Sequence, residues 1–472
     1  MNWKLAILAF TIVTQISTAH ADPKSFLYQR MLRLQAEGLE KVSSKVPAQQ
    51  MNQLIDHFAA KNTAMSGKTF KQNFYVDTSF AKSKSAPVVL YLCGEGPCEG
   101  PSGTALVNSF ASKYGAYRVA LEHRYYGTSQ PFSDLSSQHM VYLSMDQALE
   151  DLATFENMLK AKLGLTGKWI VVGGSYAGEL AAYYREKHPD LVAGALASSG
   201  PVLAKADFFE YDRHVAKVVT PECLASIKAV VSDVENKLHD ASQTAKAKAL
   251  FGASEVVDNV DFLYVIADMA AMAVQYGSQV PFCQAITQAN DSNRTAVYGA
   301  FGQKLFKNFG ITSLQDSFQG AMDTSISPGA SVGMRGWMYQ SCTEFGYYQI
   351  ANSNVAESSR SQQITQSYHN EACNRLFGIN TPVNTAATNS KYFTHLSDKS
   401  VTNIFFTNGQ NDPWSNLSLD SASTTTQNNP ALRFFTIAGG SHCSDLGSAI
   451  SSALTSARTQ FLTLAGDWLS QK

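Results

Sequence analysis

The sequence lacks several features that would assign it to a class of protein at once. Its charges nearly cancel, with 37 Lys and Arg against 38 Asp and Glu and a formal net charge of -1, so nothing attracts it to nucleic acid or to an anionic membrane. Beyond the first residues it has no apolar run near the roughly 20 residues that span a bilayer. It also lacks fixed-period repeats and long low-complexity tracts. With 44% hydrophobic and 16% charged residues, it has the composition of an ordinary globular enzyme.

The cysteines lack the spacing of a zinc site. Four residues separate Cys93 from Cys98, and no second Cys or His pair follows at ligand spacing, so neither a structural metal nor a cofactor is expected. An odd total leaves at least one thiol unpaired. The 7 cysteines are Cys93, Cys98, Cys223, Cys283, Cys342, Cys373 and Cys443.

Residues 1–21 have the pattern of a secretory signal peptide. Lys4 precedes an apolar run over 5–13, and Ala19-His20-Ala21 is a small-x-small cleavage site. We therefore expect cleavage near Asp22 and export, to the extracellular space or, depending on the host, to the periplasm or a lysosome. The alternative is an uncleaved anchor helix, although the apolar run is too short to span a bilayer. After cleavage no membrane association is expected, and disulfides should persist.

Strand-like apolar runs alternate with helix-like stretches at both ends of the chain, as in a parallel sheet with crossover helices. A helix is expected over 145–163, with Ser144 as N-cap and Gly164 as its stop. Residues 204–393 have helical runs, few strand signals and four of the seven cysteines. We predict an α/β core over 22–203 and 394–472, interrupted by a mainly helical insertion at 204–393. The strands expected lie near 88–92, 117–121, 168–172, 194–198, 403–407 and 432–437.

A nucleophile motif follows the run 168–172. Residues 173–178 read GGSYAG, and they lie between an expected strand and an expected helix, which is the context of a nucleophile elbow. Small residues flank Ser175 because bulky ones would clash in so sharp a turn, although Ala177 stands where the usual pattern has its second glycine. A hydroxyl also needs a neighbouring base and donors for the oxyanion. A glycine-rich turn without catalysis is the alternative.

An acid and a base follow in the chain order of α/β-hydrolases, which is Ser, then acid, then His. Asp412 comes one loop after the run 403–407, and His442 one loop after the run that ends at Ile437. Open α/β sheets gather their functional groups at this edge. We therefore predict that His442 takes the proton of Ser175 and that Asp412 orients the imidazole.

The oxyanion donors are predicted from the same fold. One is the backbone N–H of Tyr176, the residue after the nucleophile, and the second comes from the loop after the first core strand. Gly94 or Glu95 is the expected source, although this loop could equally be a plain turn. Together with the triad order, these features predict an α/β-hydrolase core with a large, mainly helical cap insertion.

Six ordered motifs resemble the family of serine peptidases that includes prolylcarboxypeptidase, dipeptidyl peptidase II and the thymus-specific serine protease. The resemblance extends from about residue 54 to beyond His442, which is nearly the whole mature chain. The motifs are CGEGP at 93–97, EHRYYG at 122–127, GGSYAG at 173–178, YQSCTEFG at 339–346, NGQNDPW at 408–414 and the His442 loop.

The resemblance implies a helical cap that restricts the active site and favours peptides with proline, or another small residue, near the scissile bond. It implies that Trp414 lines the specificity pocket, with a core aromatic as the alternative. Glu179 is a departure, because family members often have an apolar residue there. Its carboxylate either faces the amino terminus of a peptide or lies on the helix surface.

The resemblance also implies two disulfides in the cap, Cys342 with Cys373 and Cys223 with Cys283. The partners of the other three cysteines stay open. One hypothesis is that Cys93 or Cys98 pairs with Cys443 and clamps the active-site loops together.

The sequence therefore predicts an exported serine peptidase that acts on peptide or protein substrates, and an exopeptidase is expected. An esterase or lipase would use the same triad, and a secreted binding protein could keep the scaffold without activity. The sequence leaves open which end of a peptide is cut and the oligomeric state, a homodimer included.

Overall fold

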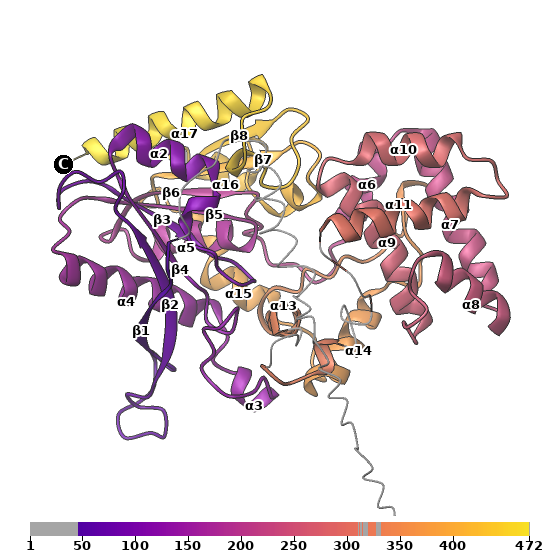
Figure 1. Ribbon diagram of the computed structural model, residues 1–472, viewed down its shortest axis with the longest axis horizontal. Helices are drawn as coiled ribbons and strands as arrows, with labels where there is room; N and C mark the ends of the chain where they lie inside the picture. Colours follow the sequence, from indigo (N-terminus) through magenta and orange to yellow (C-terminus); the bar gives the residue numbers. More distant parts are fainter. Residues whose placement is uncertain (1–45, 310, 312–313, 315–319, 327–331, 472) are drawn as a thin grey trace, which may run out of the picture.

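The computed structural model describes residues 46–309, 311, 314, 320–326 and 332–471. Over these residues one sheet is flanked by helices, and a further group of helices lies beside it (Figure 1). The predicted signal peptide, 1–21, lies outside the described residues. No helix among the described residues is both long enough and apolar enough to cross a bilayer.

The sheet has eight strands in the order β1-β2-β4-β3-β5-β6-β7-β8. The strands from β4 to β8 in this order pair in parallel, whereas β1 and β2 extend one edge in antiparallel fashion. This is the α/β-hydrolase core that the sequence predicts. The strands are β1 (Gln49–Leu54), β2 (Thr69–Asp77), β3 (Val88–Leu92), β4 (Tyr117–Leu121), β5 (Trp169–Gly174), β6 (Val192–Ser198), β7 (Ile404–Gly409) and β8 (Arg433–Ile437).

Helices cover both faces of the sheet. One face carries α2 (Ala105–Tyr114) and α17 (Ser452–Ser470), and the other carries α4 (Met145–Leu163) and α5 (Tyr176–Lys187). The prediction of a helix over 145–163 is confirmed. The hydroxyl of Ser144 accepts a hydrogen bond from the N–H of Gln147, and Gly164 ends the helix in a left-handed conformation, which satisfies orphan groups at both ends.

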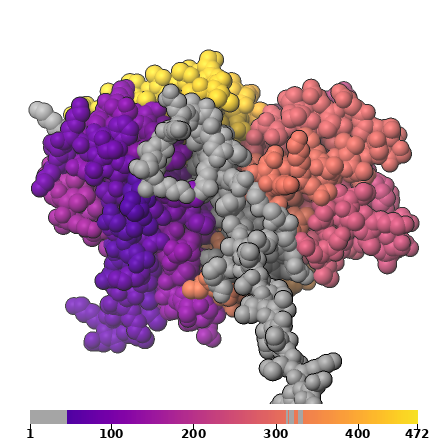
Figure 2. All heavy atoms as spheres, viewed as in Figure 1, coloured from indigo at the N-terminus to yellow at the C-terminus, as the bar shows by residue number. Residues whose placement is uncertain are grey.

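The stretch between β6 and β7 is mainly helical where it is described, and residues 204–393 are called the cap below. Figure 2 shows much of it, in red and orange, as a lobe beside the core. The cap helices are α6 (Phe209–Val218), α7 (Pro221–Lys237), α8 (Ala241–Leu250), α9 (Asn259–Gln275), α10 (Gln279–Gln288), α11 (Arg294–Asn308), α13 (Val332–Gln340), α14 (Gln366–Phe377) and α15 (Thr385–Lys391).

Two disulfides fasten the cap internally. Cys223 joins α7 to Cys283 in α10, and Cys342 joins the π-helical turn after α13 to Cys373 in α14. Both bridges are those that the family resemblance implies. The cap also shares one buried apolar cluster with the sheet, so its helices are packed on the core and not merely tethered to it.

Candidate active site

Ser175 lies at the sharp turn between β5 and α5, and its backbone is strained. Its φ is 58° and its ψ is -134°, a conformation that costs a residue with a side chain of order 1–3 kcal/mol. The turn is held by hydrogen bonds from the N–H of Ser175 to the carbonyl of Ser198 at 2.9 Å and from the N–H of Gly178 to the carbonyl of Ser175 at 2.8 Å. The side chain is therefore presented at the carboxyl edge of the sheet.

Glycine is required on both sides of Ser175. A Cβ on Gly173 would lie 1.9 Å from the carbonyl oxygen of Ala177, and a Cβ on Gly178 would lie 2.7 Å from that of Ser198. Both oxygens belong to the backbone, so they cannot move aside cheaply. The space beside Ala177 admits a methyl group, so the missing second glycine of the motif leaves the turn intact.

His442 and Asp412 meet on the loops after β8 and β7. Nδ1 of His442 donates to Oδ2 of Asp412 at 2.9 Å, and both side chains are buried. The N–H of Trp414 donates to the other carboxylate oxygen at 3.0 Å. Burial by itself lowers the pKa of His442, but the charge of Asp412, the neighbouring Cys443 and the hydrogen bonds to both raise this pKa well above its usual value. Nε2 is left pointing away from Asp412, as a general base needs.

Ser175 and His442 line one cavity between core and cap. The empty space within and above the cavity is about 670 Å³, including the part open to solvent. Most of the other lining residues come from the cap. No sequence motif marks these residues, because on helices such as α9 a residue that faces the cavity looks like one that faces the core. The lining is completed by Glu95, Tyr211, Asp268, Met272, Gln275, Tyr276, Trp337, Gln349 and Trp414.

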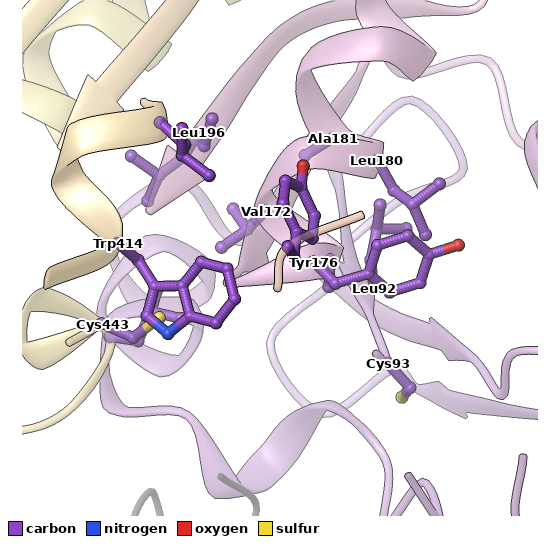
Figure 3. Close-up of a cluster of buried hydrophobic side chains, with 14 of the residues drawn as sticks. Leu92, Cys93, Val172, Tyr176, Leu180, Ala181, Leu196, Trp414 and Cys443 are labelled. Atoms are coloured by element: carbon purple, nitrogen blue, oxygen red, sulfur yellow. The ribbon is translucent and has the colours of Figure 1, made fainter. Parts of the chain in front are cut away.

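Trp414 both lines the cavity and packs as a core aromatic, and its role in specificity stays a prediction. Its indole lines the cavity, and its ring also packs at 5.4 Å from Phe208 and 5.7 Å from Tyr211. The indole N–H donates to the side chain of Gln275 at 3.1 Å. Figure 3 shows Trp414 and Tyr176 within the buried cluster around the end of the sheet. A rigid aromatic surface is thus held beside the nucleophile.

The loop after β3 lies against the nucleophile turn. A Cβ on Gly94 would be 3.6 Å from the Cβ of Ala177 and 3.8 Å from its backbone nitrogen, and the side chain of Glu95 lines the cavity with Ser175. Both residues therefore lie close to the nucleophile turn, and their role as oxyanion donors stays a prediction. Cys93 and Cys98 form a disulfide across this loop, which constrains it.

Glu179 does not reach the cavity. Its side chain is only 1% exposed, so it is not on the helix surface, and it is not among the described residues that line the cavity. Its position one turn after Ser175 directs it into the protein, where its Oε2 lies 3.2 Å from the hydroxyl of Tyr347. Burial, and to a lesser extent the charges of Glu344 and Glu95, raise its pKa well above the usual value. The prediction that Glu179 contacts substrate is therefore wrong, and so is the alternative that it lies on the helix surface.

The hypothesis of a disulfide clamp to Cys443 is also wrong. Cys93 and Cys98 pair with each other, and among the described residues Cys443 is the one free cysteine. It is fully buried, its N–H donates to the hydroxyl of Ser199 at 2.9 Å, and its thiol faces the carbonyl of Ser198 at 3.6 Å. Its loop is thus fixed to the end of β6 by hydrogen bonds.

The chain is similar to known proteins over most of its length. The profile of the serine carboxypeptidase S28 family matches residues 53–460. The chain is similar to the "probable serine protease EDA2" of Arabidopsis thaliana, with 35% identity over 77% of this chain and 74% of that protein. It is 30% identical to the mouse thymus-specific serine protease over 92% and 89% of the two chains. The bovine lysosomal Pro-X carboxypeptidase is 26% identical over 86% and 84%.

Proposed function

Because the chain belongs to the serine carboxypeptidase S28 family, we propose that it hydrolyses peptide bonds with Ser175 as nucleophile, His442 as general base and Asp412 as the orienting acid. The observation that carries this assignment is the hydrogen bond between His442 and Asp412 at the edge of the cavity that Ser175 lines. The family membership supports peptides over esters as substrates, and the hydrogen bond between His442 and Asp412 beside the cavity that Ser175 lines disfavours an inactive binding protein.

The steps follow from the geometry. Oγ of Ser175 attacks the carbonyl carbon while its proton passes to Nε2 of His442, and Asp412 stabilises the imidazolium. The oxyanion accepts hydrogen bonds from the N–H of Tyr176 and from that of Gly94 or Glu95. The C–N bond breaks as His442 gives its proton to the leaving amine. Water then attacks the acyl-enzyme by the same route, which releases the acid and restores Ser175.

We further propose an exopeptidase that prefers proline, or another small residue, near the scissile bond. The cap covers the cavity, so the end of a peptide enters more easily than an internal loop of a folded protein. Aromatic rings of Trp414, Trp337 and Tyr211 line it, and such rings pack well on a pyrrolidine. The name of the bovine relative supports the same preference. The disulfides and the leader pattern support export.

The first test combines covalent labelling with kinetics. Wild-type protein should react with a fluorophosphonate probe and should cleave Ala-Pro amides faster than Ala-Lys amides or short-chain fatty esters. Ser175→Ala should abolish labelling and lower kcat by roughly 10⁶-fold, because the triad acts as a unit. Ser83→Ala, on an exposed loop, is the control and should behave as the wild type. An unlabelled wild type, or a tenth of the rate left in Ser175→Ala, would contradict the assignment.

A further inference from the structure

Two motifs of the sequence, EHRYYG at 122–127 and YQSCTEFG at 339–346, meet at a single phenol that the mechanism above does not use. The side chain of Tyr176 is fully buried. Its oxygen lies 3.0 Å from Nε2 of His123, in the loop after β4, and 2.8 Å from Nε2 of Gln340, at the end of cap helix α13. Core and cap therefore hold the residue after the nucleophile from two sides.

The direction of each hydrogen bond can be assigned. The carbonyl of Arg124 can only accept, so Nδ1 of His123, 2.7 Å away, carries the proton, and Nε2 accepts from the hydroxyl of Tyr176. The amide N–H of Gln340 donates to the phenol oxygen, and its carbonyl accepts from the hydroxyl of Tyr126 at 2.5 Å. Burial lowers the pKa of His123 to about 4, so the ring stays neutral and this polarity is kept near neutral pH. Each group in this series of hydrogen bonds is therefore fixed as a donor or as an acceptor.

The same stretch of the cap also touches the phenol ring and the cavity. Trp337 lines the cavity, and its ring lies 5.9 Å from that of Tyr176 in an edge-to-face contact. Phe345, in the π-helical turn after Gln340, lies 5.5 Å from the Tyr176 ring. A shift of α13 would therefore move the ring of Tyr176, and with it the adjoining peptide.

We propose that His123 and Gln340 are positioning residues, which hold the Tyr176 ring so that its backbone N–H points at the oxyanion. The inference rests on the proposed function, because it assigns an oxyanion donor to Tyr176. Such donors work by being fixed in advance, and loss of one lowers kcat by about 10²–10³-fold. Both motifs thus serve the chemical step, and the cap contributes to the rate as well as to substrate selection.

Removing the side-chain groups that make these hydrogen bonds tests the proposal. Tyr176→Phe deletes only the hydroxyl, and Gln340→Met keeps the size of the side chain. Each should lower kcat by about tenfold to a hundredfold, since the donor is displaced but not lost, with KM changed by less than about threefold. The double variant should lose less than the product of the two effects, because both changes break one shared bond. The matched control is Tyr298→Phe, which removes a buried hydroxyl that donates to Ile266 at 2.8 Å within the cap.

A transition-state analogue separates positioning from general damage. The affinity for a peptide boronate, whose adduct carries the tetrahedral oxygen, should fall in parallel with kcat, whereas the affinity for a product peptide should stay constant. Thermal unfolding should show losses no larger than that of Tyr298→Phe. If Gln340→Met does not fold, Tyr126→Phe is tested in its place, because it removes the neighbouring hydrogen bond from Tyr126 to Gln340. A kcat within twofold of the control in folded variants would overturn the proposal, whereas a wild type that no fluorophosphonate labels would overturn the proposed function itself.

Discussion

Glu179 places a carboxyl group one turn after the nucleophile, and the structure explains how this buried group is tolerated. Tyr347 has one hydroxyl proton, and its hydroxyl donates to the carbonyl of Pro201. The contact between Tyr347 and Glu179 is then best made by a proton on the carboxyl group. The raised pKa of Glu179, caused first by burial, agrees with a neutral acid. Glu179 therefore acts as a buried hydrogen-bond donor and not as a charge.

Glu179→Gln should leave kcat/KM within about threefold and reduce the loss of stability at high pH. The pKa of Glu179 is raised in the folded state, above about 4.3 in the unfolded chain, so its contribution to stability is full below that value and is lost as pH rises through the folded pKa. The urea midpoint at pH 5.5 and pH 8.5 measures this. A hundredfold fall in kcat/KM would instead place Glu179 in contact with substrate.

The sequence was informative about residues that follow strands and uninformative about residues that face the cavity from helices. Ser175, Asp412 and His442 could be placed because each lies at the end of a strand or in the loop that follows it, and parallel strands end at one edge of the sheet. Asp268 and Gln275 could not, because the apolar composition of α9 is that of any core helix. Only tertiary packing decides which of its faces meets the nucleophile.

Strands β1 and β2 were not predicted from the sequence. They lie at the antiparallel edge and carry polar residues on their buried side, whereas the search relied on continuous apolar runs. Gln53 and Gln72 are fully buried, and their amide groups donate to the backbone carbonyls of Asp151 and Glu122. A buried glutamine with a backbone partner is stable, but its strand has no hydrophobic alternation to recognise.

Helix α17 should be a major source of stability for the core. Trp468 is 4% exposed and packs on β6 so closely that a Cβ on Gly194 would lie 2.1 Å from its ring. Trp468→Ala should lower the free energy of unfolding by about 3–5 kcal/mol, as measured by urea denaturation, while kcat below the transition stays unchanged. Thr463→Ala, exposed on the same helix, should cost far less. A loss under about 1 kcal/mol for Trp468→Ala would show that the helix is dispensable.

Across the whole molecule, buried carboxyl groups should make the fold less stable at alkaline pH. Burial is the largest cause in each case. It raises the pKa of Glu156 to about 7 and that of Glu344 to about 8, and it also raises the pKa of Glu122 and Asp445. Raised carboxyl pKa values contribute stability at acid pH that is lost as pH rises through the folded values.

The unfolding temperature should therefore fall between pH 6.5 and pH 8.5, a window that contains the folded pKa values of Glu156 and Glu344. The lowered pKa of His123, about 4, works in the opposite direction only below about pH 6.5. The double variant Glu156→Gln, Glu344→Gln should show a smaller fall in calorimetry, and Glu371→Gln, exposed on α14, should leave it unchanged. An unfolding temperature that is constant or higher at pH 8.5 would refute this expectation.

The order of core, cap and core could be predicted from the positions where strand-like patterns stop and resume in the sequence. The cap predicted at 204–393 begins after β6 ends at Ser198, and β7 resumes at Ile404. The way the cap sits on the core could not be predicted, because it depends on contacts such as that between Gln340 and Tyr176, which are distant in sequence and polar. Hydrophobic periodicity contains no information about such pairs.

The free thiol of Cys443 can make unfolding irreversible. While the fold is intact, this thiol is sealed between the ends of β6 and β8, and no oxidant or disulfide reaches it. Once the chain opens in oxidising surroundings, a freed thiolate can attack the three bridges and exchange partners with them. We therefore expect heat inactivation under such conditions to be irreversible and to follow the rate at which the fold opens.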